Sequence, residues 1–247
     1  MQQYKADLHI HTLLSPCGDL EMTPANIVKR AAELNINVIG ITDHNSTKHC
    51  ELIKKMAEQK GIYTLCGAEV TTKEETHCLT FFENHDLLNE FQKFLDEFLP
   101  AIKNNPDYFG HQVVIDENEM IIEEVENLLI TGITRSIDQV EAKVHELNGL
   151  FIPAHIDRQK FSLISQLGFV PPDLNADAFE ITGYTAKEEI IQKFPYMKNK
   201  TFIRSSDAHR VEGIGIGSSI FEIETLSFDE IKKALAGIEG RGVLINN

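Results

Sequence analysis

Strand-like and helix-like runs alternate along most of this chain, and this alternation constrains the fold more than any other feature of the sequence. Helix start signals stand between the runs, for example Thr23 followed by Pro24, and Ser136 followed three residues later by Gln139. Strands that alternate with helices predict an α/β fold with parallel strands. The strand-like runs occupy residues 4–10, 36–41, 62–68, 77–82, 150–154, 176–181, 201–205, 218–223 and 243–245.

Histidines and carboxylates gather at the ends of these strand-like runs. His9 and His11 lie one residue apart at the end of the first run, so a strand would point both side chains the same way. The carboxyl ends of strands in a βα barrel converge on one mouth, where active sites form. We therefore expect the polar residues that follow the later runs to join this pair, namely Asp43, His44, Glu69, His155, Asp207 and His209.

Composition limits the classes of function. The 247 residues are 42% hydrophobic, which is enough for one sizeable core. Asp7 and two histidines interrupt the first apolar stretch, and no apolar run approaches the roughly 20 residues of a membrane span, so we expect a cytoplasmic protein without a signal peptide. The net charge of −15 favours cationic cofactors and opposes strong binding of duplex nucleic acid. The four cysteines show no C-x-x-C pair and predict no disulfide framework.

Residues 104–130 break the alternation. The run from His111 to Ile122 predicts a β-hairpin around residues 116–119, which we interpret as an insertion. We expect one barrel domain over residues 1–247 that carries this insertion. Three further histidines, His49, His85 and His145, fall in helix-like segments, and we expect them to be ordinary exposed or half-buried residues.

In order along the chain, these motifs resemble those of the PHP family, which is named after polymerase and histidinol phosphatase. The resemblance implies a distorted (β/α)7 TIM-like barrel that holds two to three divalent metal ions at its mouth and hydrolyses phosphoesters, most closely like the stand-alone phosphoesterase branch. The motifs that carry it are His9-x-His11, Thr-Asp-His44, Gly-Ala-Glu69, Pro-Ala-His155 and Ser-Asp-Ala-His209.

The resemblance further implies that residues from distant parts of the chain share the metal ions. Glu69 would bridge two ions, and Glu69, Asp207 and His209 would form the catalytic centre. Imidazoles and carboxylates suit zinc, manganese or iron. The implied ligands are His9, His11, Cys17, His44, Glu69, His77, His155, Asp207 and His209.

Two of these ligand positions have alternatives. In the loop after His11, the ligand is Cys17, whose thiolate would suit zinc or iron, or Asp19, or no residue. The other position belongs to His77, eight residues after Glu69, or to His111 on the predicted hairpin, and we favour His77.

Charged residues beside the ligands have predicted supporting roles. Arg158 and Arg210 closely follow ligand positions near the mouth, where a guanidinium can contact phosphate through two hydrogen bonds. Asp7 and Asp43 flank ligands, so we expect them to orient an imidazole through its second nitrogen. The alternative for Asp43 is a helix N-cap.

The predicted function is metal-dependent hydrolysis of a small phosphate ester, a nucleotide or a short nucleic-acid end, with a water shared by two ions as nucleophile. One alternative is an amidohydrolase, which also starts with His-x-His, but which often has a metal-bridging lysine where this chain has Glu69. The other alternative is a non-catalytic, metal-stabilised binding or regulatory module. Retention of nearly all ligand positions favours the enzyme.

Overall fold

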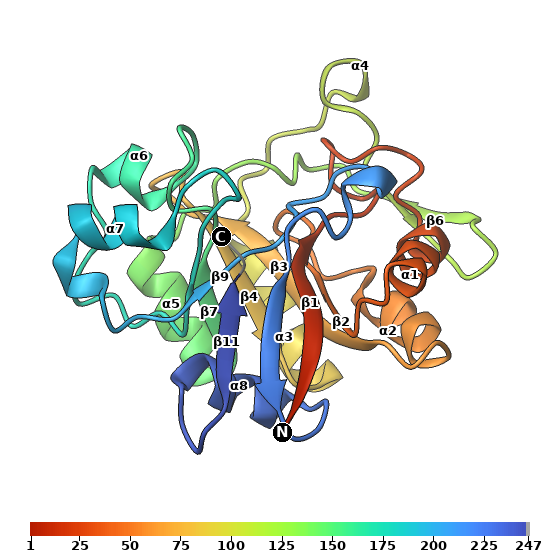
Figure 1. Cartoon of the computed structure of the whole chain (residues 1–247). Coiled ribbons are helices and arrows are strands. Elements are labelled where there is room, and N and C mark those ends of the chain that lie inside the picture. The colour runs from red at the N-terminus through yellow and green to blue at the C-terminus, as the bar shows by residue number, and fades with distance from the viewer. Residues whose placement is uncertain (246–247) are drawn as a thin grey trace.

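The computed structural model of the chain describes residues 1–245, and the last two residues of the predicted domain lie outside this range (Figure 1). Its main sheet has seven strands in the order β11-β10-β1-β2-β3-β4-β7. The strands are β1 Gln2–Ile10, β2 Val38–Ile41, β3 Tyr63–Thr71, β4 His77–Phe82, β5 Val113–Ile115, β6 Ile121–Glu124, β7 Leu150–Pro153, β8 Phe179–Glu180, β9 Phe202–Ile203, β10 Ser219–Ile223 and β11 Gly242–Ile245. The helices are α1 Pro24–Glu33, α2 Cys50–Glu58, α3 His85–Phe98, α4 Pro106–Phe109, α5 Ile137–Glu146, α6 Leu163–Leu167, α7 Lys187–Lys193 and α8 Phe228–Ala236, with 3-10 turns at Pro195–Met197 and Val211–Gly213.

The sheet curls towards a closed barrel. Strands β1, β2 and β3 run parallel, and the short β8 and β9 form a second parallel pair. This pair fills the gap between β7 and β1, because Ile156 N donates to Glu180 O at 2.9 Å and His11 N donates to Ala208 O at 3.0 Å. The predicted distorted TIM-like α/β barrel is therefore confirmed.

Strands β10 and β4 depart from the predicted parallel arrangement. Strand β10 is antiparallel to both β1 and β11, and β4 is antiparallel to both β3 and β7. The first residue of β4, His77, pairs with Thr71 at the end of β3, so the start of β4 lies at the mouth of the barrel. The side chain of His77 can therefore approach Glu69 of β3 from a neighbouring strand.

Local sequence signals start the helices as expected. The Thr23 hydroxyl accepts a hydrogen bond from Asn26 N at the start of α1, and Pro24 is the first helical residue. Ser136 and Gln139 form a capping box at the start of α5. These caps satisfy backbone N–H groups that a helix N-terminus leaves without partners.

Apolar side chains fill one end of the barrel and leave the other end to polar residues. Leu8, Leu79 and Ile152 of the sheet pack in one cluster with Phe228 and Ile231 of α8, which covers the end near the N-terminus (Figure 1). A larger cluster packs between the sheet and the outer helices. The carboxyl ends of β1, β2 and β3 lie at the opposite end, where the polar residues gather.

The predicted hairpin is present as β5 and β6, which form a separate two-stranded sheet within residues 104–130. It packs on the loop after β1, because Leu13 contacts Val113 and Ile115 in one small apolar cluster. In Figure 1, α4 of this insertion projects from the mouth end of the barrel. No helix in residues 1–245 is long and apolar enough to cross a membrane. The single-domain organisation and the cytoplasmic location stay predictions.

Candidate metal centre

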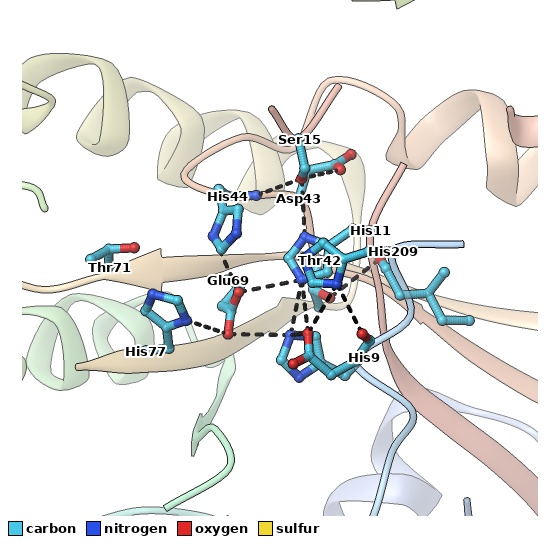
Figure 2. A network of polar contacts seen from close by, with 12 residues as sticks. His9, His11, Ser15, Thr42, Asp43, His44, Glu69, Thr71, His77 and His209 are labelled. Carbon is cyan, nitrogen blue, oxygen red and sulfur yellow. Dashed lines mark hydrogen bonds and ion pairs between the residues drawn. The ribbon is translucent and has the colours of Figure 1, made fainter. Parts of the chain in front are cut away.

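The carboxylate of Glu69 lies at the centre of a ring of imidazoles (Figure 2). Glu69 is only 1% exposed, and its two oxygens lie 2.9–3.3 Å from ring nitrogens of five histidines. These histidines come from four strand ends of the barrel, because His9 and His11 both lie at the end of β1. They are His9, His11, His44, His77 and His155.

Asp207 and His209 complete the cluster from the segment after β9. Asp207 Oδ1 lies 3.3 Å from His9 Nε2 and 3.4 Å from His11 Nε2. The His209 ring stacks on the His11 ring with 4.1 Å between centroids. The structure thus brings together eight of the nine predicted ligands.

The side-chain atoms of the cluster fit a bound metal better than they fit each other. His44 Nδ1 and His77 Nδ1 lie 3.2 and 2.9 Å from Glu69 oxygens, yet both nitrogens are buried without a hydrogen bond to any residue between 1 and 245. Nitrogen and oxygen atoms that approach without hydrogen-bond geometry fit ligands directed at a common cation. Three groups of ligand atoms lie within 4.8 Å of one another: His11, His44 and His209; His9, His11 and Glu69; and His44, Glu69 and His77.

Burial and neighbouring charges shift the pKa values of the cluster residues. Burial raises the pKa of Glu69, but the charges of the surrounding imidazoles outweigh it and hold this pKa well below its ordinary value. Burial lowers the pKa of His44 and of His77. Burial and the charge of His11 lower the pKa of His209 to about 4. His9 and His11 differ from these residues. Burial lowers their pKa values, but the carboxylates of Glu180 and Glu69 raise the pKa of His9 well above its ordinary value, and Asp207 and Glu69 raise that of His11 to about 9. Both imidazoles would therefore release a proton when they bind a cation.

Glu180, at the end of β8, supports the cluster and was not predicted. Its Oε2 lies 3.0 Å from His9 Nδ1 and accepts a hydrogen bond from His155 N at 2.9 Å. Glu180 is only 2% exposed. A carboxylate inside a strand-like run was the signal in the sequence that could have identified it.

Asp43 supports His11 indirectly. It accepts hydrogen bonds from Thr12 N and from the Ser15 hydroxyl, both at 2.7 Å, and Ser15 Oγ lies 3.0 Å from His11 Nδ1. The predicted contact with an imidazole therefore runs through a hydroxyl group. The alternative, a helix N-cap, is wrong because α2 begins only at Cys50.

His49 is part of the same network, contrary to the expectation of an ordinary exposed or half-buried residue. It is 1% exposed, and its Nε2 accepts a hydrogen bond from Ile115 N of the hairpin at 3.0 Å. Its Nδ1 lies 2.7 Å from the Thr12 hydroxyl, which donates to Asp43. The inserted hairpin is thereby connected to the support of the cluster.

Asp7 binds backbone, which corrects the prediction that it orients an imidazole. Its carboxylate accepts hydrogen bonds from Ser206 N at 2.9 Å and Gly215 N at 2.8 Å. Asp7 therefore fixes the segment that carries Asp207. The other two helix histidines match the expectation, since His85 is exposed and His145 is half-buried.

The alternative ligands lie at the edge of the cluster or away from it. Cys17 is in an exposed loop, where desolvation and the charge of Glu69 raise the pKa of its thiol to about 12. The Asp19 carboxylate is also exposed and accepts a hydrogen bond from Glu21 N at 2.9 Å. His111 lies on the exposed side of the hairpin, 3.0 Å from Glu124, and takes no part in the cluster.

The two predicted phosphate-binding arginines differ. Arg158 is half exposed, and its Nη1 donates to Asp207 Oδ2 at the edge of the cluster. Arg158 also lines a cleft of about 480 Å³ that opens beside His155 and Asp207. Arg210 is exposed and forms no ion pair within residues 1–245. Arg158 is therefore better placed than Arg210 to contact a substrate near the cluster.

A family model described as the PHP domain matches residues 7–151, which is more than half of the chain and includes the segment from His9 to His77. The chain belongs to the PHP domain family. This result confirms the resemblance on which the predicted function rests. The remaining cluster residues, His155, Asp207 and His209, lie after the matched segment.

Alignments with similar proteins and structures cover nearly the whole of this PHP chain. Uncharacterized protein YqxK of Bacillus subtilis is 24% identical over 277 aligned positions, which cover 100% of this chain and 65% of YqxK. The structure resembles the lesion-specific endonuclease PfuEndoQ of Pyrococcus furiosus, with a TM-score of 0.71 and 20% identity over 98% of this chain and 58% of PfuEndoQ. It also resembles a protein of Bifidobacterium adolescentis with the provisional name metal-dependent phosphoesterase, with a TM-score of 0.65 and 16% identity over 94% and 95% of the two chains. The chain thus spans about three fifths of the length of YqxK and PfuEndoQ.

Proposed function

We propose that this PHP protein is a metal-dependent phosphoesterase that hydrolyses a small phosphate ester, a nucleotide or a short nucleic-acid end. The observation that carries the proposal is the single buried carboxylate of Glu69 within 3.3 Å of five histidines. A carboxylate shared in this way can bridge two cations and reduce their mutual repulsion. Membership of the PHP family and the similarity to PfuEndoQ support a hydrolase.

The chain offers ligands for two to three divalent ions, with zinc, manganese and iron as the candidates. Bound ions would supply an activated water and stabilise negative charge on the phosphate. The residues that would hold them are His9, His11, His44, Glu69, His77, His155, Asp207 and His209, with Cys17 as a further candidate.

The protein's own groups would position the phosphate. The Arg158 guanidinium reaches Asp207 Oδ2 at the edge of the cluster, so it can also reach a phosphate bound there. Two parallel hydrogen bonds from a guanidinium orient a phosphate and oppose its charge. Asp207 would connect the two parts of the site, because its Oδ1 lies beside His9 and His11.

The experiment is a hydrolysis assay on the full chain with p-nitrophenyl phosphate and bis-p-nitrophenyl phosphate, with and without manganese. We expect turnover that a chelator abolishes and that manganese restores. Glu69→Gln should lower the metal content, since it removes the charge that the ligands share. It should also lower kcat by at least about 100-fold. Bound metal without turnover of these esters or of mononucleotides and short oligonucleotides would contradict the proposal and favour the non-catalytic binding module.

A further inference from the structure

The cleft beside the metal cluster carries two large apolar side chains that do not pack into the core. Tyr184 is 99% exposed and Ile216 is 82% exposed, and both line the same cleft as Arg158 and Asp207. Single exposed apolar residues are common on protein surfaces, but two at one cleft beside a charged cluster suggest a binding surface. The cleft volume of about 480 Å³ is in the range of small-molecule sites.

Hydrogen bonds hold the backbone of the loops that carry these two side chains, although the side chains themselves are exposed to solvent. Thr182 N donates to Asp157 Oδ1 at 2.9 Å, and Tyr184 N donates to the Thr182 hydroxyl at 3.4 Å. In the other loop, the buried Asp7 carboxylate accepts a hydrogen bond from Gly215 N. The backbone therefore presents both side chains to solvent in defined places, which lowers the entropic cost of binding.

Gly217 fixes the second loop still more closely. A Cβ atom at Gly217 would lie 2.0 Å from Ser205 O, so only glycine allows the two loops to approach this far. Both Gly217 and Ser205 line the cleft. The exposed position of Ile216 follows from this contact and from the Asp7 hydrogen bond one residue earlier.

Polar atoms beside the cleft have unused hydrogen-bonding capacity. Glu180 Oε1 and Ser205 Oγ are buried and have no hydrogen-bond partner among the described residues. Buried polar atoms without partners are uncommon in folded proteins and favour a site that a ligand completes. A ligand for this cleft should therefore combine an apolar face with polar edges, next to a phosphate at Arg158.

We propose that the cleft binds a nucleobase, and hence that the substrate is a mononucleotide or the end of a single strand. The inference rests on the proposed phosphoesterase function and specifies its substrate. A base has an apolar face for Tyr184 and Ile216 and polar edges for Ser205 and Glu180. The net charge of −15 opposes a long phosphate backbone, which favours a single nucleotide over a duplex.

The test compares two probes that differ only in the base, adenosine 5′-monophosphate and ribose 5-phosphate. Calorimetric titration of each into the manganese-loaded protein gives their affinities, and hydrolysis assays give kcat/KM. We expect adenosine 5′-monophosphate to bind at least about tenfold more tightly. Tyr184→Ala should remove most of this difference, Tyr184→Phe should keep it, and neither should change the affinity for ribose 5-phosphate.

The control variant is Tyr108→Ala, which removes an exposed tyrosine on α4 that does not line the cleft. It should leave both affinities unchanged. Equal affinities for the two probes, or a base preference that survives Tyr184→Ala, would overturn the inference. Failure of the proposed phosphoesterase function would look different, because no ester would then be hydrolysed whatever the order of the affinities.

Discussion

The carboxylate of Glu180 lies 3.0 Å from Nδ1 of His9, on the opposite side of the imidazole from the candidate metal centre. This contact favours the tautomer with the proton on Nδ1, which leaves the Nε2 lone pair directed towards Glu69 and Asp207. The same Glu180 oxygen accepts the hydrogen bond of His155 N. One residue of β8 thus holds two of the proposed ligands in place.

Glu180→Gln is expected to weaken metal binding because the amide loses the charge that holds the His9 proton. Changes to residues that orient metal ligands commonly lower metal affinity 10- to 100-fold, and we expect about tenfold for this conservative change. Manganese titration by calorimetry measures the effect independently of activity. The matched control is Glu188→Gln at an exposed position of α7, which should bind manganese like the unmodified protein. Equal affinities for the two variants would show that Glu180 does not position His9.

A pair of variants tests the choice between His77 and His111. His77 Nδ1 lies 2.9 Å from Glu69 Oε1, whereas His111 contacts Glu124 on the hairpin. We expect His77→Ala to lower the number of bound ions by about one and kcat/KM by at least about tenfold. His111→Ala should change neither quantity. Metal loss in His111→Ala with full retention in His77→Ala, measured by elemental analysis, would reverse the assignment.

The positions of the strand ends followed from the sequence, because hydrophobic runs with polar ends indicate where parallel strands meet. His9, Glu69 and Asp207 are far apart in the chain, and this rule alone was enough to expect them at one mouth. The antiparallel direction of β4 did not follow, since a six-residue run such as His77–Phe82 has the same appearance in either direction.

The supporting residues were harder to predict because their roles depend on long-range contacts. Glu180 lies inside a strand-like run, and Asp7 binds the backbone of a segment about 200 residues later. His155 and Asp207 have positive φ angles of 30° and 52°, although no glycine in their motifs signals a left-handed backbone. Such conformations are kept only where the surrounding structure imposes them.

A count of bound metal ions tests whether Cys17 is a ligand. Desolvation and the charge of Glu69 raise the pKa of the thiol to about 12, so Cys17 is protonated without a cation. It can become a ligand only by releasing this proton to solvent as its sulfur binds the ion. We expect Cys17→Ser to lower the metal content by about one ion per chain. Asp19→Asn should leave it unchanged, because the Asp19 carboxylate accepts its own hydrogen bond from Glu21 N. An unchanged metal content and activity in Cys17→Ser would remove Cys17 from the site.

The buried imidazole of His49 predicts a pH dependence of stability that a single substitution removes. Burial lowers the pKa of His49, and the nearby Asp43 charge does not outweigh this effect. Its Nε2 must stay unprotonated to accept the hydrogen bond from Ile115 N. Below the pKa of about 6.5 in the unfolded chain, only the unfolded state binds the proton, so stability falls as pH falls towards the lower folded-state pKa. The slope from this one group is at most about 1.4 kcal/mol per pH unit.

His49→Leu should therefore have two effects on the free energy of unfolding, measured by urea denaturation between pH 5 and pH 8. At pH 8 the variant should be about 1–3 kcal/mol less stable, because Ile115 N is left buried without an acceptor. Between pH 7 and pH 5 its stability should fall less steeply than that of the unmodified protein. His85→Leu, at an exposed position, should stay within about 0.5 kcal/mol of the unmodified protein at pH 8. Identical slopes for His49→Leu and the unmodified protein would mean that His49 takes up a proton as readily in the folded state as in the unfolded chain. The link from the hairpin through Thr12 to Asp43 would then not depend on the neutral form of His49.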